Sequence, residues 1–418
     1  MGFAQGSVSF KRFAVIGKAK DMPKDVDQEL IDKLVANTLT PSEFGGTDDT
    51  EYGWSGGRHV FDGQFSFDRN VFNDAISFAL RVDTNKVPGD IKNAWQMIEE
   101  EAVAKANPSG FISKQQKKGV KDVIREKVEE ETKSGKYRRS KLIPILWDLP
   151  GKTVYSTASG GNLEKLLEIF ERSFGLELQP ITSGSLAMQI AEAKQRKRDY
   201  EDLRPTRFAW GPEGEGQQAE YPWVAKGPEP KDFLGNEFMV WLWHEADAKA
   251  GSIPVEGLGE VAILFDKSLD LDCVYGQTGK DTIRGDGPTR TPEARDALRV
   301  GKVPRKAGLI LNCKEQFELT LTGESLAVST CKLPEIEDAE TPRALFEERI
   351  TLIRDFAKII DGLFGAFLKI RSSSSWEGQT NGLRRWVQQS GRPTPVMLET
   401  VSTVHRVVQE KEKLAEVE

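Results

Sequence analysis

Two short stretches carry residue types close to known catalytic spacings. YGQTGKDT (residues 275–282) resembles the phosphate-binding Walker loop, G-x-x-x-x-G-K-[ST], but Val274 stands where the first glycine belongs and Asp281 replaces the hydroxyl residue. His244–Glu245 lacks the second histidine, four positions after the first, that a zinc-protease helix requires. The sequence therefore predicts neither a nucleotide loop nor a zinc-protease site, and His244 is interpreted as a half-buried residue beside tryptophans.

Asp270 and Asp272 are the remaining catalytic candidates, because carboxylate oxygens are ligands that Mg²⁺ prefers. The same pair would be ordinary on the solvent face of a strand end. The three cysteines, Cys273, Cys313 and Cys331, form no C-x-x-C pair and are predicted to be reduced, buried thiols. We predict a protein that is not an enzyme and holds no cofactor or metal, with a metal-dependent nuclease on Asp270 and Asp272 as the alternative.

Positive charge is strongly segregated in this acidic chain. The formal net charge is −7, yet residues 114–141 contain 11 lysines and arginines against 5 acidic residues. Two further basic clusters cover residues 194–207, with six positive residues against three negative, and 280–306, with eight against four. Each Lys or Arg that neutralises a DNA phosphate releases counterions, so these clusters predict an anion-binding surface for nucleic acid.

Helical spacing sharpens the first cluster. Ser113 is a candidate N-cap for a helix over residues 114–131. Its cations follow one stripe at helical spacing, with valines and an isoleucine on another side, and the stripe consists of Lys114, Lys117, Lys118, Lys121 and Arg125. In the following loop, KSGKYRRS, Tyr137 lies between basic residues and could stack on bases or be an ordinary surface tyrosine.

The elements that would position these residues predict an α+β fold with antiparallel sheets and packed helices. The expected strands of the first half cover residues 8–17, 64–72, 75–88, 141–149 and 152–159, and its expected helices cover residues 25–39, 90–106, 114–131 and 161–174. Residues 41–57 are interpreted as a glycine-rich turn region. A basic helix is expected over residues 191–204, and the second half is predicted to consist of helices near 233–249, 291–300 and 345–371 around further strands.

Four regions follow from this pattern. They are an N-terminal α+β domain with the basic helix (1–185), a basic helix with a Pro/Gly-rich linker (186–232), a C-terminal α+β domain (233–371) and a polar tail (372–418), whose charged end at residues 406–418 is expected to be peripheral. No secretory signal and no apolar run of about 18 residues is found, so we expect a cytoplasmic protein without a membrane partner.

An ordered set of motifs runs through the chain. The first half contains FKRFAVIG, Gly53–Trp54, RVDTNKVPGDI, KKGVKDVI and WDLPGKTVYSTASGGNLEKLLEIFERSFG. The second half contains GKVPRKAGLIL and FELTLTGESLAVSTCKLP. Together these motifs resemble the RdgC family of bacterial recombination-associated proteins. The chain departs from the family at EEETKSGKYRR, which replaces an L-L-P-R-A-F-like run, and it is longer at residues 204–259 and after residue 371.

The resemblance implies a ring-shaped homodimer that encircles or clamps double-stranded DNA without sequence specificity, is associated with the nucleoid, and limits the access of the RecA recombinase to DNA. Lys121 falls on the family's basic helix, and Tyr137 falls near its loop-tip aromatic. Lys302 and Lys306 match two lysines of its G-K segment, and Arg284 lies near a basic loop at its ring gate.

The combined hypothesis is sequence-nonspecific binding of duplex DNA. The predicted DNA-binding residues are Lys114, Lys117, Lys118, Lys121, Arg125, Lys136, Tyr137, Arg138, Arg139, Arg284, Lys302, Arg305 and Lys306. The alternatives are the metal-dependent nuclease and a protein scaffold whose basic faces bind acidic partners.

Overall fold

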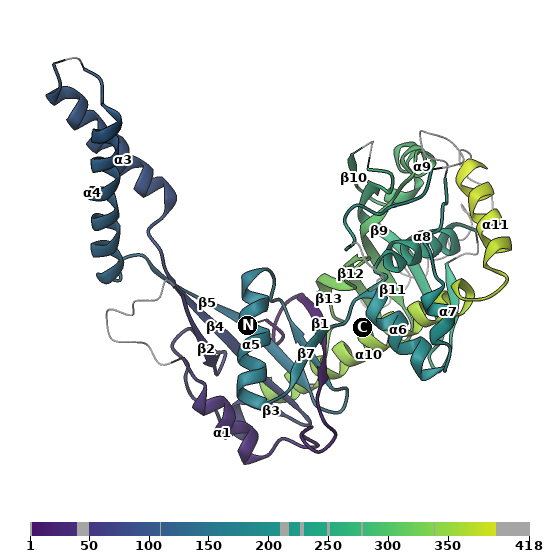
Figure 1. The fold of residues 1–418 in the computed structure, drawn as a ribbon. Helices are drawn as coiled ribbons and strands as arrows, with labels where there is room; N and C mark the ends of the chain where they lie inside the picture. Colours follow the sequence, from purple (N-terminus) through teal and green to yellow (C-terminus); the bar gives the residue numbers. More distant parts are fainter. Residues whose placement is uncertain are drawn as a thin grey trace, which may run out of the picture. The chain divides into compact units, whose positions relative to one another are not determined.

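The computed structural model describes residues 2–39, 50–108, 110–209, 217–225, 230–248, 251–276, 279–337 and 339–389. These residues form an α+β fold of helices and antiparallel sheet in two compact units (Figure 1), which confirms the predicted fold class. Unit 1 comprises Val15–Leu178. Unit 2 comprises Gly2–Ala14 and the chain from Gln179 onward, because the first strand pairs with the last strand of the second half.

Unit 1 is a four-stranded antiparallel sheet, in the order β6-β5-β4-β2, with β3 added beside β4. Its elements in chain order are α1 (Gln28–Ala36), β2 (Thr50–Ser55), α2 (Phe67–Asn70), β3 (Val71–Phe72), β4 (Ala75–Asn85), α3 (Gly89–Ala106), α4 (Lys114–Lys133), β5 (Arg138–Asp148), β6 (Thr153–Ser156) and α5 (Gly161–Phe174). β7 (Glu177–Pro180) crosses the boundary between the units.

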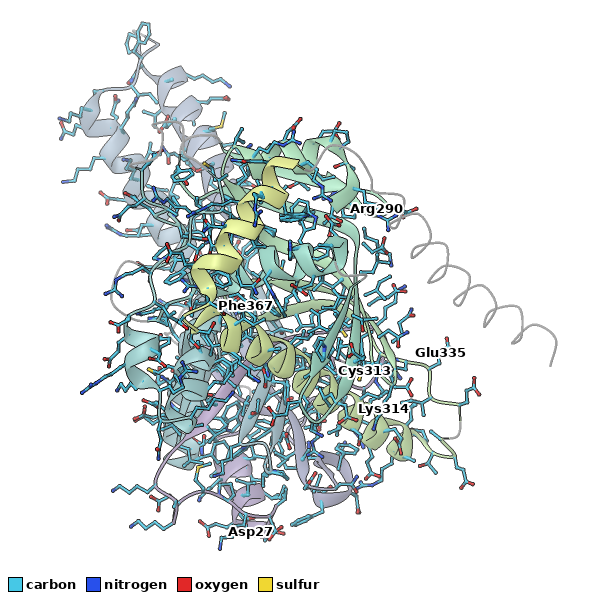
Figure 2. All side chains as sticks on the ribbon, turned by 90° about the vertical axis from the view of Figure 1, so that its right-hand side faces the viewer. Asp27, Arg290, Cys313, Lys314, Glu335 and Phe367 are labelled. Carbon is cyan, nitrogen blue, oxygen red and sulfur yellow. The ribbon has the colours of Figure 1, made fainter. Side chains whose placement is uncertain are left out.

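The core of unit 1 is aromatic. α5 buries Phe170 and Phe174, and their rings lie 4.9 and 5.0 Å from the ring of Trp147 on β5. Trp54 on β2 is fully buried, and its indole Nε1 donates a hydrogen bond of 2.9 Å to Ser173 Oγ. Each such buried side chain contributes about 1.5–3 kcal/mol to folding. α1 begins at the N-cap Asp27, labelled in Figure 2, whose carboxylate accepts from the Leu30 amide.

α3 and α4 form a helical hairpin, called the arm from here on, that projects from the sheet of unit 1 (Figure 1). The arm lies between β4 and β5, and the residues on either side of it, Asn85 and Arg138, are partners across these strands. α3 buries no residue, and α4 buries only Val120 and Ile124. The arm therefore adds almost nothing to the core of unit 1 and presents most of its surface to solvent.

Unit 2 contains an antiparallel sheet in the order β10-β9-β11-β12-β13-β1, with β8 paired to β9. Its elements are β1 (Val8–Ile16), α6 (Ser183–Ala193), α7 (Lys197–Glu201), α8 (Phe233–Ala248), β8 (Ser252–Val255), β9 (Gly259–Cys273), β10 (Lys280–Arg284), the 3₁₀ helix η1 (Pro288–Arg290), α9 (Pro292–Arg299), β11 (Lys302–Asn312), β12 (Gln316–Thr322), β13 (Ala327–Lys332), α10 (Pro342–Arg371) and α11 (Trp376–Gln389).

The core of unit 2 is built around α8 and the long helix α10. Phe238 on α8 packs edge-on to Phe364 of α10, with ring centroids 5.3 Å apart, and also contacts Phe367, labelled in Figure 2. One buried ion pair joins the same helices, since Arg371 Nε lies 2.6 Å from Glu237 Oε2. Glu237 Oε1 also accepts the Thr206 amide, so both carboxylate oxygens have partners.

Two predicted features differ in the structure, and the tail contains a helix that was not predicted. The helix expected over residues 191–204 is interrupted between α6 and α7, where Gln195 adopts a left-handed φ of 57°. In the tail, α11 buries Leu383 and Val387, whereas residues 406–418, which were expected to be peripheral, lie outside the described part of the chain. The turn region expected at 41–57 includes strand β2, while its first residues lie outside the described part of the chain.

Two further boundaries shift. The strand expected over residues 64–72 contains the short helix α2 before β3, and β5 begins at Arg138 inside the expected loop. Within the described residues, none of the helices combines the length and the apolar character that a membrane crossing requires.

Candidate nucleic-acid interface

Helix α4 begins as predicted at a capping box. Ser113 Oγ accepts from the Gln116 amide, and the Gln116 side chain accepts from the Ser113 amide. Such caps stabilise a helix by about 0.5–2 kcal/mol. Because the capped first turn carries Lys114, Lys117 and Lys118, the capping box fixes the direction in which the basic end of the helix leaves the tip of the arm.

Few contacts hold the two arm helices together. Val120 and Ile124 provide the buried face of α4, and the Lys127 ammonium lies 4.8 Å from the centre of the Trp95 ring on α3. Near the tip, the side-chain amides of Asn107 and Gln116 bond reciprocally at 3.0 and 2.8 Å. These contacts fix which face of α4 points toward α3 and leave its other faces in solvent.

The predicted lysine stripe lies on an exposed face of α4. All five of its residues are exposed, from Lys114 to Arg125. The ammonium groups of its lysines, 114, 117, 118 and 121, lie within 4.0 Å of no carboxylate among the described residues, whereas Arg125 pairs with Asp122 at 3.1 Å. Four neighbouring positive charges therefore share one face of the helix, and their charge is not compensated by a direct ion pair.

Sequence reasoning missed one residue of this surface. Phe111, in the loop between α3 and α4, has a side chain that is 80% exposed, the highest value among the large exposed hydrophobic residues of the described chain. It lies three residues before Lys114, and Ile112 follows it in the same loop. The sequence signal that could have identified it is a phenylalanine placed shortly before the capping serine. Its ring could stack on an exposed base or insert into a groove of nucleic acid.

The base of the arm is held by an ion network rather than by cations open to DNA. Arg138 lies 2.9 Å from Asp83 and 3.1 Å from Glu51, and Arg81 lies 2.7 Å from the same Asp83 oxygen. Burial alone raises the pKa of Asp83, but hydrogen bonds from Arg81, Ser140 and Arg138 outweigh it and hold the pKa below its usual value. Arg138 is thus engaged in ion pairs within unit 1, and its role as a DNA contact stays a prediction.

The other predicted residues of this loop are divided. Lys136 lies 3.4 Å from Glu131 and 5.5 Å from the ring of Tyr137, which is half-buried rather than displayed at a tip. Arg139 is exposed on β5. Of Lys136, Tyr137 and Arg139, only Arg139 is exposed and forms no ion pair among the described residues.

Two cations of the third basic cluster form ion pairs within unit 2. Lys302 is 7% exposed and lies 2.7 Å from Asp281, and Arg305 contacts both Asp272 and Glu324. These two residues neutralise carboxylates of their own fold, and their assignment as phosphate contacts stays a prediction. Arg284 is exposed on β10, and Lys306 is half-exposed on β11.

The second cluster contains both paired and unpaired cations. Arg196 pairs with Asp199, and Lys197 lies 3.7 Å from Glu192. Lys194 and Arg198 are exposed and form no ion pair among the described residues. The first cluster lies in unit 1 and the other two lie in unit 2, so the candidate interface is built here from the arm of unit 1 alone.

Of the alternative nuclease pair, Asp272 is engaged in contacts within unit 2. Asp272 accepts from the Cys273 amide through one oxygen, and its other oxygen lies 3.3 Å from Arg305 and 3.5 Å from Lys280. In the part of the chain that the structure describes, no three His, Cys, Asp or Glu side chains gather as a metal site. His244 contacts Glu245 and the ring of Trp386, as a histidine beside tryptophans.

No protein-family model matches the chain, and no curated protein matches it either. The likeness to RdgC therefore stays a prediction.

Proposed function

We propose that this chain binds double-stranded DNA without sequence preference and without catalysis, and that the lysine stripe of α4 contacts the phosphate backbone. The observation that carries the proposal is the row of Lys114, Lys117, Lys118 and Lys121 on one exposed helix face, with no carboxylate within 4.0 Å among the described residues. Lysines that are already paired would lose an existing interaction when they bind phosphate, whereas these lysines would not.

The dimensions of the stripe fit a duplex. From Lys114 to Arg125 it extends for about 17 Å along the helix axis. Duplex DNA carries roughly one negative charge per 1.7 Å of its axis, so each lysine can find a phosphate. Lysine ammonium groups are compact point charges without the planar fork that reads guanine, and phosphate contacts carry no sequence information. Binding of this kind is therefore indifferent to sequence.

The decisive variant is Lys117→Glu/Lys118→Glu/Lys121→Glu. We expect it to abolish binding of a fluorescent duplex in an anisotropy titration at about 100 mM salt. The matched control is Lys18→Glu/Lys20→Glu/Lys24→Glu, which changes the net charge equally at exposed lysines near the N-terminus of unit 1. The control should keep near wild-type affinity, which separates the local stripe from the total charge.

Salt dependence tests the mechanism. Three or four phosphate contacts predict that log K falls against log salt with a slope of about −3 to −4, and each lost lysine reduces the slope by about 1. Two unrelated duplexes should bind equally. A flat salt dependence, a strong preference for one sequence, or equal binding by the triple-glutamate variant would refute the proposal. Stronger binding to an acidic protein that plain duplex fails to displace would favour the scaffold alternative.

A further inference from the structure

A small cavity in unit 2 has an apolar floor. It lies where α6, α7 and the C-terminal end of α10 meet (Figure 1), and its volume is about 40 Å³. Ala191, Leu203 and Leu368 line it, and all three side chains are buried. A water molecule needs about 10–15 Å³ of such a cavity, so there is room for roughly three groups of the size of a water molecule or a methylene. Because the floor is apolar, carbon atoms suit it better than water does.

Positive charge lies at the mouth of this cavity. Lys194, Arg196 and Lys369 line the cavity, and all three residues are exposed. Arg196 pairs at 2.5 Å with Asp199, the one carboxylate among the lining residues. The ammonium groups of Lys194 and Lys369 form no hydrogen bond and no ion pair with any residue that the structure describes. The cavity therefore combines an apolar floor with two positive charges that no neighbouring carboxylate compensates.

The backbone between α6 and α7 fixes the mouth relative to the floor. Gln195 has a left-handed φ of 57°, which residues other than glycine rarely adopt, and the chain turns sharply there. The amide of Arg196 then bonds to the carbonyl of Ala191 at 2.7 Å. The Arg196 guanidinium also donates to the Ser372 carbonyl at 3.1 Å, which joins this turn to the end of α10. The cations on both sides of Gln195 are therefore held beside the buried floor by the fold itself.

We propose that this cavity binds a short-chain carboxylate of the size of butyrate. The alkyl chain would fill the apolar floor, and the carboxylate would lie at the mouth, within reach of the Lys194 and Lys369 ammonium groups. Inorganic phosphate has no apolar part to bury, and an alkylamine would be repelled by the two lysines. A longer acid would leave its additional methylene groups in water, so the volume of the cavity sets the chain length of the ligand.

Carboxylate binding at this cavity is independent of the proposed DNA contact. The cavity belongs to unit 2, whereas the lysine stripe belongs to the arm of unit 1. The binding of a carboxylate can therefore be measured on the full chain without DNA. A failure of this inference would leave the proposed function untouched, and a failure of DNA binding would leave the cavity untouched.

A ligand series on the full chain tests the inference, with dissociation constants measured by ligand-observed NMR. Butyrate should bind with a dissociation constant on the order of 1 mM, as expected for so small a ligand. From acetate through propionate to butyrate, the affinity should rise about 4-fold with each methylene group, because each enters the floor. Hexanoate should bind within about 2-fold of butyrate, because its additional methylene groups stay in water. Phosphate and butylammonium should each bind at least about 10-fold more weakly than butyrate.

Variants of the mouth and of the floor give the second test. Lys194→Ala/Lys369→Ala should weaken butyrate binding about 10-fold, because both charges at the mouth are lost. Arg198→Ala/Lys314→Ala, at exposed cations of unit 2 that do not line the cavity, is the matched control and should leave the dissociation constant unchanged. Ala191→Leu should fill the floor and remove the dependence on chain length, and circular dichroism checks that this variant is folded. Phosphate that binds as well as butyrate, an affinity that does not rise from acetate to butyrate, or unchanged binding by the double lysine variant overturns the inference.

Discussion

Asp83 joins two arginines at the base of the arm, and its pKa is held below the usual value. Asp83→Asn should lower the free energy of unfolding by about 3 kcal/mol at pH 7, because it leaves the charges of Arg81 and Arg138 without their shared partner. Urea titrations followed by tryptophan fluorescence measure this loss. Asp21→Asn, at an exposed loop position, is the control and should change stability by less than about 0.5 kcal/mol.

The pH dependence of this difference has a definite sign. The folded-state pKa of Asp83 is depressed, so its stabilisation is complete above the unfolded value of about 3.9 and is lost as the pH falls through the folded pKa. The gap between wild type and Asp83→Asn should therefore stay constant from pH 7 to 5 and shrink below about pH 4. A gap that is constant down to pH 2.5 would show that Asp83 is not the responsible group.

Single residues also show which features of the structure could be predicted from the sequence and which could not. The exposure of Lys117 and Lys121 followed from helical spacing beside Val120 and Ile124, because neighbours on a helix are set by the local chain. The pairing of Lys302 with Asp281 could not be predicted in this way. The two residues are far apart in sequence and meet only through the register of β9, β10 and β11. Partners across strands are fixed by the whole sheet, and no local pattern encodes them.

At the scale of elements, the arm is an insertion that the rest of unit 1 does not need. Asn85 and Arg138 are direct partners across β4 and β5, so replacing residues 86–137 by Asn-Gly would close a two-residue hairpin in register. α3 buries nothing, and α4 buries only Val120 and Ile124. The excised segment also contains Val87, whose side chain is 4% exposed, so the excised protein should lose no more than about 3 kcal/mol of the stability of unit 1.

The same excision should remove duplex binding, because the lysine stripe leaves with the arm. Thermal unfolding and fluorescence anisotropy on one preparation measure both effects. If the excised protein keeps its affinity for duplex DNA, the interface must be formed by other cations, such as Lys194 and Arg198. A collapse of stability would instead show that the arm supports the core, contrary to its burial.

Helices were predicted better than the connections between them. α4 and α5 followed from Ser113 and Gly175, since caps and stops are local features, and Gly175 indeed adopts the left-handed conformation at the end of α5. The break between α6 and α7 was missed because it depends on Gln195 adopting a positive φ, which glycine or asparagine would signal and glutamine does not. α11 was missed because its polar composition hides the buried Leu383 and Val387.

At the scale of the whole molecule, charge is divided between a basic helix and an acidic remainder. Residues 114–141 carry a surplus of positive charge, while the full chain has a formal charge of −7. Under the proposed function, the acidic remainder would repel DNA from the other surfaces of the protein. Four unpaired lysines of this surplus share the N-terminal half of α4, so substitutions there should weaken the proposed interaction most.

A protein that covers duplex DNA in this way should hinder a recombinase that needs the same duplex, and this consequence extends the proposed function to recombination. In a RecA-catalysed strand-exchange assay, duplex incubated first with the wild-type protein should be exchanged at least several-fold more slowly. The Lys117→Glu/Lys118→Glu/Lys121→Glu variant, at the same concentration, should leave the rate unchanged, and Lys18→Glu/Lys20→Glu/Lys24→Glu should inhibit like the wild type. Because competition for phosphates weakens with salt, inhibition should fade between 50 and 200 mM salt in parallel with duplex affinity. Equal inhibition by the triple-glutamate variant of α4 would mean that the protein acts on the recombinase itself and not through its hold on DNA.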